Sequence, residues 1–206
     1  MLITNLKQVS ILSSPSLIRA LEGVDRADFV PKHLASLAYT DTALPIGEGQ
    51  TISQPYTVVF MLEQLQVQPG DTVLEIGYGS GWQTALLAHL VGPAGRIYAL
   101  ELLPSLCKQG EDHLKKYPRL SQRIRFFCQS GERGYAEGAP FDRIVAAAEV
   151  ADVPMIWREQ LKTGGRMIYP KDGALVAEVK KRNNSFEVVT FPGFAFVPFI
   201  YESKEI

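Results

Sequence analysis

The sequence predicts a doubly wound α/β domain whose sheet is mostly parallel, with an antiparallel C-terminal edge. Short apolar strand patterns alternate with helical patterns from residue 72 to residue 169. Strands that are apolar on both faces are typical of a parallel sheet covered by helices. After Gly173 the strand patterns follow one another without helices between them. Strands joined in this way are typical of antiparallel pairing.

The expected elements follow one another closely along the chain. Strands are expected at residues 72–76, 96–101, 124–128, 143–148, 166–169, 175–180, 186–191 and 194–200. Helices are expected from Pro55 onward and at residues 82–91, 104–116 and 154–161. Ser14-Pro15 marks a further helix start, because proline at the first helical position loses no hydrogen bond. Asn183-Asn184 is typical of a hairpin turn.

The chain length of 206 residues is that of a single domain. Within it we expect N-terminal helices and a covering loop at 1–55, an α/β core at 56–173 and the antiparallel edge at 174–206. Residues 38–54 show neither helical nor strand periodicity. Long segments without regular structure inside a compact domain are usually functional. We therefore interpret residues 38–54 as a lid over a binding site.

Composition excludes several classes of protein. Lys and Arg number 21 and Asp and Glu 22, so the net charge of −1 argues against binding nucleic acid through charge. No apolar stretch is long enough to cross a bilayer, and without a signal-peptide pattern a cytoplasmic location is expected. Cys107 and Cys128 are interpreted as buried packing residues. His33, His89 and His113 are scattered, so no metal site is expected.

The first strand of the alternation ends in a glycine-rich loop, 77–81, with the sequence GYGSG. In such sheets ligands bind at the carboxyl ends of the strands, and glycine lets the backbone approach a ligand closely. The spacing is one residue shorter than the dinucleotide fingerprint and favours a nucleoside cofactor with an amino-acid tail. Glu101 ends the next strand, where an acidic side chain can accept hydrogen bonds from ribose. A structural turn and a surface glutamate are the alternative interpretation.

Longer motifs carry a family resemblance. The segment VLEIGYGSGWQTALLAHLVG, with YALE downstream, is similar to the cofactor site of class I S-adenosylmethionine-dependent methyltransferases. FVPKHLASLAYTDTALPIGEGQTISQPY, FDRIVAAA, LKTGGRMIYP and FVPFI resemble one branch of that class, the protein-L-isoaspartate O-methyltransferases. The resemblance runs from about Asp25 to Ile200 and implies a Rossmann-like methyltransferase fold. It also implies esterification of the α-carboxyl of L-isoaspartyl residues in damaged proteins, with S-adenosyl-L-methionine as cofactor.

The resemblance further implies roles for individual residues. The residues that would hold the cofactor lie in the lid and at the ends of three strands: Thr51, Ile52, Ser53, Glu75, Gly77, Gly79, Gly81, Glu101, Leu102, Ser130 and Gly131. Ser53 matches the catalytic serine of the family. Tyr39, Asp41, Val197 and Pro198 would line the substrate site. One structural alternative stays open, because Ser53 could instead cap the helix that follows it.

Methyl transfer to a carboxylate requires little acid–base chemistry from side chains. A carboxylate with a pKa of about 4 is already ionised at neutral pH. The enzyme must align donor and acceptor and exclude water. On this hypothesis Ser53 orients the acceptor by a hydrogen bond. The expected partners are isoaspartyl proteins or peptides, or a small-molecule acceptor, without nucleic acid, membrane or metal.

Several positions depart from the family pattern. Ser130 stands where the family has an aspartate that contacts adenine, and Tyr78 and Trp82 stand where it more usually has Thr and Tyr. Glu149 adds a negative charge beside the substrate entrance or points into solvent, and Ala195 replaces an arginine. Two alternatives follow from these departures. One is a methyltransferase with a different, small-molecule acceptor, and the other is a catalytically silent cofactor-binding homologue.

Overall fold

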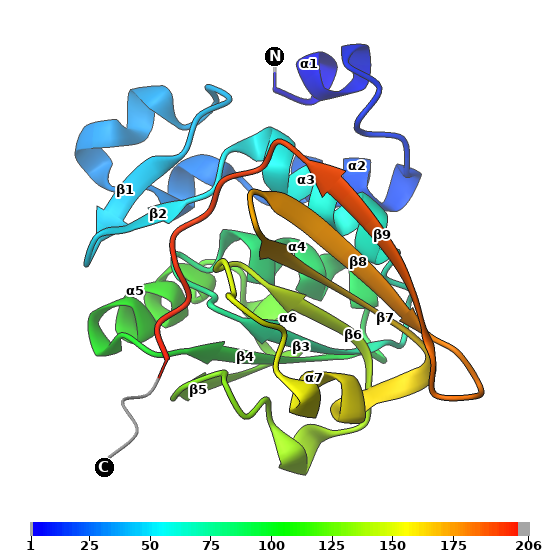
Figure 1. Cartoon of the computed structure of the whole chain (residues 1–206). Coiled ribbons are helices and arrows are strands. Elements are labelled where there is room, and N and C mark those ends of the chain that lie inside the picture. The colour runs from blue at the N-terminus through cyan, green and yellow to red at the C-terminus, as the bar shows by residue number, and fades with distance from the viewer. Residues whose placement is uncertain (1, 202–206) are drawn as a thin grey trace.

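The computed structural model describes residues 2–201. Seven strands form one sheet in the order β5-β4-β3-β6-β7-β8-β9 (Figure 1). Their bounds are β3 Thr72–Ile76, β4 Arg96–Glu101, β5 Ile124–Cys128, β6 Phe141–Ala146, β7 Leu161–Lys171, β8 Ala174–Lys180 and β9 Phe186–Pro192. Neighbours from β5 to β7 pair in parallel, whereas β7, β8 and β9 pair antiparallel. The predicted fold class is confirmed.

The helices follow the predicted alternation. Their bounds are α1 Leu2–Gln8, α2 Pro15–Gly23, α3 Pro55–Leu65, α4 Trp82–Val91, α5 Pro104–Leu114, α6 Pro118–Ser121 and α7 Met155–Gln160. Short 3-10 helices lie at Arg26–Phe29, Lys32–Leu37 and Ala136–Gly138. The start of α2 is as predicted, because the Ser14 hydroxyl accepts a hydrogen bond from the Leu17 N–H at 3.3 Å.

Helices cover both faces of the sheet. Buried residues of α2, α3, α4 and α5 form one apolar core with one side of the strands. A second core lies on the other face, where Trp157 of α7 packs with Phe141 and Tyr169. None of the helices within residues 2–201 combines the length and apolar character that crossing a bilayer requires.

The lid contains regular structure that its sequence does not predict. Residues Leu44–Gly47 (β1) and Gln50–Ile52 (β2) form an antiparallel hairpin. Each strand is too short for a periodic pattern, yet Leu44 and Ile46 are buried while Pro45 faces outward. Gly47 and Gly49 have φ values of 103° and 69°, which glycine adopts readily at the turn. The expectation of no strand in residues 38–54 was therefore wrong.

The C-terminal segment departs from prediction in the opposite sense. Asn183-Asn184 does form the turn between β8 and β9, but residues 194–200 form no strand. This segment is fastened through Glu149, whose N–H donates to the Val197 carbonyl and whose carbonyl accepts from the Phe199 N–H, both at 2.8 Å. Pro198 lies between these two residues and forms an isolated parallel bridge with Glu149. The bridge is not extended, because the Ala151 N–H donates to the Tyr201 hydroxyl at 3.0 Å. Residues 202–206 of the predicted edge lie outside the described residues.

The two cysteines are joined rather than merely packed. Cys107 of α5 and Cys128 at the end of β5 form a disulfide. They are 21 residues apart, and their proximity follows from the packing of α5 against β5. The interpretation of both as buried packing residues holds for the burial of Cys107 but not for Cys128, which is exposed, and it missed the bond between them. The bond ties α5 to the sheet beside the carboxyl end of β4.

Breaking the disulfide should lower stability, because the cross-link restricts the unfolded chain. For a closed loop of this length the loss is about 3 kcal/mol. Urea unfolding with and without reductant measures the loss. A Cys107→Ala/Cys128→Ala double variant should match the reduced wild type and should not respond to reductant. Equal midpoints for the oxidised and reduced wild type would contradict the prediction.

Candidate functional site

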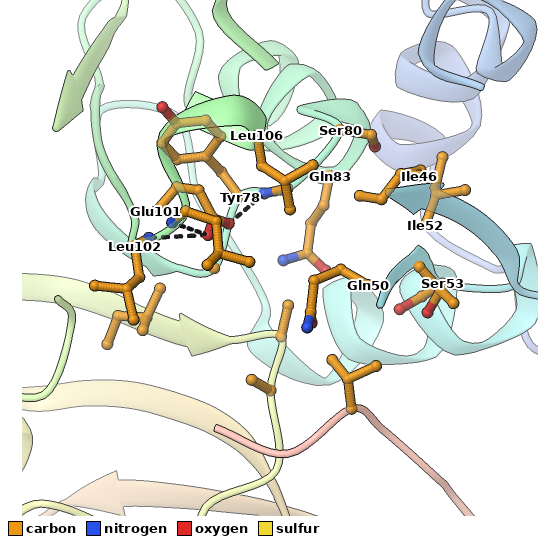
Figure 2. A pocket seen from close by; sticks show the side chains of 18 of the residues that line it. Ile46, Gln50, Ile52, Ser53, Tyr78, Ser80, Gln83, Glu101, Leu102 and Leu106 are labelled. Carbon is orange, nitrogen blue, oxygen red and sulfur yellow. Dashed lines mark hydrogen bonds between the residues drawn. The ribbon is translucent and has the colours of Figure 1, made fainter. Parts of the chain in front are cut away.

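A pocket lies at the carboxyl ends of β3 and β4. The lid hairpin lies on one side of it and the glycine-rich loop 77–81 on the other. Figure 2 shows Glu101 and Ser53 towards opposite ends of the pocket, with Gln83 and Gln50 between them. In Figure 1 the hairpin, drawn light blue, and the segment after β9, drawn red, lie on the side of the sheet towards which β4 and β5 point. A pocket with largely apolar walls and a few fixed polar groups suits a small organic ligand.

The carboxylate of Glu101 organises one end of the pocket. Its Oε1 accepts hydrogen bonds from the backbone N–H groups of Leu102 and Leu103 at 2.8 and 3.1 Å. Its Oε2 accepts from the Gly79 N–H at 2.9 Å. A carboxylate has about four lone-pair sites, so Glu101 can still accept a hydrogen bond from a ligand hydroxyl. Three backbone donors also fix the direction in which it does so.

The glycine-rich loop is held against β4 and α5. The N–H groups of Gly77 and Tyr78 both donate to the Leu100 carbonyl, at 2.8 and 3.2 Å. Gly81 has φ 86°, and a Cβ placed on it would lie 2.6 Å from the side chain of Leu114. Only glycine fits here, because both the backbone conformation and the space exclude a side chain. The loop therefore turns directly into α4 with its backbone facing the pocket.

A buried polar pair lies beneath this loop. Glu75 is fully buried, and its Oε1 accepts a hydrogen bond from Nε2 of Gln83 at 3.1 Å. Its Oε2 has no hydrogen-bond partner among residues 2–201. Burial raises the pKa of Glu75 to about 7. Gln83 lines the pocket, so Glu75 acts on the site by orienting Gln83.

A second pocket adjoins the first. Four residues line both pockets: Thr51, Ser53, Ala147 and Val197. The remaining lining residues of the second pocket are uncharged and include Gln54 and Thr57. The Ser53 hydroxyl makes no hydrogen bond within the described chain and is therefore available to a bound molecule. Ser53 thus stands where two ligands would meet.

The capping alternative for Ser53 is wrong. Gln54 occupies the N-cap position of α3, and its side chain makes no hydrogen bond to the helix. The carboxylate of Asp41, in the lid, caps α3 instead, because its Oδ1 accepts from the Tyr56 N–H at 2.8 Å. Ser53 is left free to face the pockets.

Most of the predicted cofactor residues line the first pocket. They are Thr51, Ile52, Ser53, Gly77, Gly79, Glu101, Leu102 and Gly131, and they are joined there by Val197 and Pro198. Glu75 and Gly81 support the loop without lining the pocket. The Ser130 hydroxyl accepts from the Glu132 N–H at 3.1 Å and likewise lies outside the lining.

Tyr39 and Asp41 line neither of the two pockets. Together with Trp82, they line a separate cavity beside α1. The Tyr39 hydroxyl donates to Asp25 at 2.8 Å. Asp41 therefore supports the site by capping α3, and it does not line either of the two pockets.

The positions that depart from the family pattern have different surroundings. Tyr78 is buried, and its hydroxyl donates to the Cys107 carbonyl at 3.2 Å, which fastens the loop to α5. Trp82 lines the first pocket. The Glu149 carboxylate accepts from the Gly173 N–H at 3.0 Å and lines neither pocket. Ala195 does line the second pocket, so position 195 supplies no cation there.

Several lining residues were missed from the sequence. They are apolar or amide side chains, namely Ile46, Gln50, Gln83, Leu103 and Leu106. Gln83 could have been found, because it follows the glycine-rich loop in the first turn of α4, where side chains face a bound ligand. Ile46 and Gln50 could not, because the hairpin that places them is itself unpredicted.

The arrangement suits the binding and alignment of two molecules. One end of the first pocket offers a fixed carboxylate for hydroxyl groups, and its walls are largely apolar. The other end opens at Ser53 onto an uncharged, polar second pocket. Within residues 2–201 no three His, Cys, Asp or Glu side chains gather in a way that could hold a metal ion.

The family model and the curated relatives point to the same family. The model of the protein-L-isoaspartate(D-aspartate) O-methyltransferase family matches residues 1–204. A protein-L-isoaspartate O-methyltransferase of Methanopyrus kandleri is 39% identical over 207 residues, covering 98% of this chain and 90% of the relative. The enzyme of that name from Yersinia enterocolitica is 41% identical over 201 residues, covering 97% and 94%.

A solved structure gives the same fold. The Plasmodium falciparum protein, assigned as a protein-L-isoaspartate O-methyltransferase and crystallised with S-adenosyl-L-homocysteine, superposes with a TM-score of 0.87. The alignment covers 97% of this chain and 96% of that protein, at 23% sequence identity. At this identity the likeness establishes the fold.

The raised pKa of Glu75 has a consequence for stability. Between pH 4.5 and about 7 the folded protein binds more protons at Glu75 than the unfolded chain does, so its contribution to stability falls as pH rises through that range. A Glu75→Gln variant lacks this loss. We expect the free energy of unfolding of Glu75→Gln, measured in urea, to rise by about 1–3 kcal/mol relative to that of wild type between pH 4.5 and pH 8. A stability difference that does not change with pH would contradict the prediction.

Proposed function

The chain belongs to the protein-L-isoaspartate(D-aspartate) O-methyltransferase family, and we propose that it esterifies the α-carboxyl of L-isoaspartyl residues in damaged proteins, with S-adenosyl-L-methionine as methyl donor. One observation carries the proposal beyond the family. Ser53 lines both the pocket that contains Glu101 and the polar pocket beside it. The first would take the cofactor and the second the acceptor.

The residues of the first pocket fit this cofactor. Glu101 has an acceptor site left for the ribose hydroxyls after its three backbone hydrogen bonds. Leu102, Leu103 and Leu106 offer apolar surface beside it for the adenine. The loop backbone at Gly77 and Gly79 would face the amino-acid part, with Gln83 beside it.

The proposed reaction needs positioning more than acid–base chemistry. When bound, S-adenosyl-L-methionine supplies an electrophilic methyl group on a sulfonium sulfur. The acceptor carboxylate is ionised at neutral pH and needs no base. The chain must therefore hold the acceptor oxygen in line and exclude water. The Ser53 hydroxyl would donate a hydrogen bond to the carboxylate and orient it, while the lid hairpin covers the site.

The acceptor is recognised through uncharged groups. The second pocket contains the hydroxyls of Thr51, Ser53 and Thr57 and the amide of Gln54, and no lining residue is charged. Hydroxyl and amide donors can bind a carboxylate without a cation. Glu149 bonds to Gly173 and lines neither pocket, so the charge that favoured a small-molecule acceptor is not directed at the site. The curated relatives carry the name of the isoaspartyl enzyme, which favours that acceptor over a small molecule and over a silent homologue.

Glu101→Gln should weaken cofactor binding, because the amide retains only one acceptor oxygen and loses the charge. Hydrogen bonds to charged groups are worth about 1.5–3 kcal/mol, which is roughly a 10- to 100-fold rise in the Kd for S-adenosyl-L-homocysteine. Isothermal titration calorimetry measures it. Glu137→Gln, an exposed substitution outside the pockets, is the control and should bind like wild type. An unchanged Kd for Glu101→Gln would refute the assignment.

The proposed activity is tested by transfer of labelled methyl groups to an isoaspartyl peptide, with the aspartyl peptide as control. We expect base-labile label on the isoaspartyl peptide alone. Ser53→Ala should lower kcat by roughly 10- to 100-fold through loss of one hydrogen bond to the carboxylate. Its Kd for S-adenosyl-L-homocysteine should change little.

The matched control is Ser121→Ala, at the end of α6 and away from both pockets. It should retain wild-type turnover. Tight binding of S-adenosyl-L-homocysteine without methylation of the isoaspartyl peptide would show that the acceptor is wrongly assigned. Equal kcat in Ser53→Ala and wild type would remove Ser53 from the mechanism.

A further inference from the structure

Arg26 is a charged side chain placed in the interior. Only 1% of its surface is exposed. It begins the 3-10 helix Arg26–Phe29, whose first turn is fixed by the Asp25 carboxylate, which accepts from the Ala27 N–H at 2.9 Å. This turn directs the guanidinium beneath the lid. A buried charge is costly unless it is hydrogen-bonded. The hydrogen bonds of the Arg26 guanidinium therefore indicate its role.

The guanidinium of Arg26 holds both ends of the lid. Nη1 donates to the Ala38 carbonyl at 2.6 Å. Nη2 donates to the carbonyls of Thr42 and Ser53 at 3.1 and 3.0 Å. The hairpin β1–β2 lies between these attachment points in the sequence. One side chain therefore closes the chain segment that covers the first pocket and ends at Ser53.

The same side chain reaches the wall of the first pocket. Its guanidinium carbon lies 5.3 Å from the ring centroid of Trp82, within the range of a cation–π contact. Trp82 is the first residue of α4 and lines the pocket. Asp41, from the same stretch of lid, binds the N–H of Tyr56 at the start of α3. Arg26 thus connects both ends of the lid to Trp82, and Asp41 fastens the lid to α3. The hairpin turn is held as well, because the Glu48 carboxylate accepts from the Ser105 hydroxyl of α5 at 2.8 Å.

Arginine suits this position in a way that lysine does not. Its planar fork presents donors in several fixed directions, whereas lysine has one nitrogen at the end of a flexible chain. Three carbonyls from separate parts of the lid need donors on two different nitrogens. The positive charge also strengthens each of these hydrogen bonds.

We propose that Arg26 is a positioning residue for methyl transfer, which fastens both ends of the lid and thereby holds the hairpin over the cofactor and Ser53 against the acceptor. Arg26 lines neither the first nor the second pocket, so it acts through the lid. The proposal rests on the proposed function for the identity of the ligands. The attachment of the lid can be measured without any methyl acceptor.

The test compares Arg26→Lys with Arg166→Lys. Arg166 is a matched control, because its part-buried guanidinium also donates to a backbone carbonyl, that of Gln64 at 2.9 Å, away from the pockets. Hydrogen exchange is followed by mass spectrometry on lid peptides 38–53 and on peptides from β3 and β4. Dissociation of S-adenosyl-L-homocysteine is followed by stopped flow, and kcat is measured with the isoaspartyl peptide.

For Arg26→Lys we expect faster exchange in the lid with unchanged protection of β3 and β4. Dissociation of S-adenosyl-L-homocysteine should quicken about tenfold and kcat should fall by about tenfold or more, in line with the loss of one or two charge-assisted hydrogen bonds. Arg166→Lys should leave all three readouts near wild type. Loss of protection in β3 and β4 together with the lid would overturn the proposal, and so would unchanged exchange in the lid.

Chemical rescue supplies a second measurement. A cavity lined by Arg26, Tyr39 and Trp82 adjoins the guanidinium, so methylguanidinium can enter the space left in Arg26→Ala. Millimolar methylguanidinium should restore slow exchange in the lid and slow dissociation of S-adenosyl-L-homocysteine, and methylammonium should not. Rescue of neither would overturn the proposal. If the lid responds as expected but the isoaspartyl peptide is never methylated, the acceptor alone is wrongly assigned.

Discussion

The carboxylate of Glu101 is the point on which the site depends. It accepts hydrogen bonds from Gly79 in the glycine-rich loop and from Leu102 and Leu103 beyond its own strand. Parallel pairing of β3 with β4 brings these groups together, because both strands end at the same edge of the sheet. The loop, β4 and the start of α5 are therefore held in one arrangement before any ligand arrives, and the cost of ordering them on binding is reduced.

A second set of contacts closes the site from the other side. The lid lacks a core of its own and depends on contacts from elsewhere in the chain. Arg26 binds its carbonyl groups, and Asp41 binds the start of α3. Ser53 is fixed through its backbone while its side chain remains free. This separation suits the role proposed for Ser53, which is to present its hydroxyl to a ligand in a constant direction.

The residues that depart from the family pattern have identifiable contacts in the fold. Tyr78 uses its hydroxyl to fasten the glycine-rich loop to α5, a region that the Cys107–Cys128 disulfide also ties to the sheet. Glu149 turns to the Gly173 N–H. Ala195 leaves the second pocket without a cation, so the proposed carboxylate acceptor would rely on hydroxyl and amide donors. Such a pocket selects by geometry more than by charge.

The sequence by itself determined the parallel sheet, the helices that alternate with its strands and the place of the glycine-rich loop beside Glu101, because these depend on local periodicity and on glycine spacing. Tertiary structure decided the rest. The hairpin in residues 38–54 forms from strands too short to show a pattern. Residues 194–200 make only an isolated bridge, from Pro198 to Glu149, because the Ala151 N–H bonds to the Tyr201 hydroxyl instead of continuing the ladder. The Cys107–Cys128 bond and the contacts of Arg26 join residues far apart in the sequence or buried together only in the fold. No local pattern encodes such contacts, since they depend on how separate elements meet.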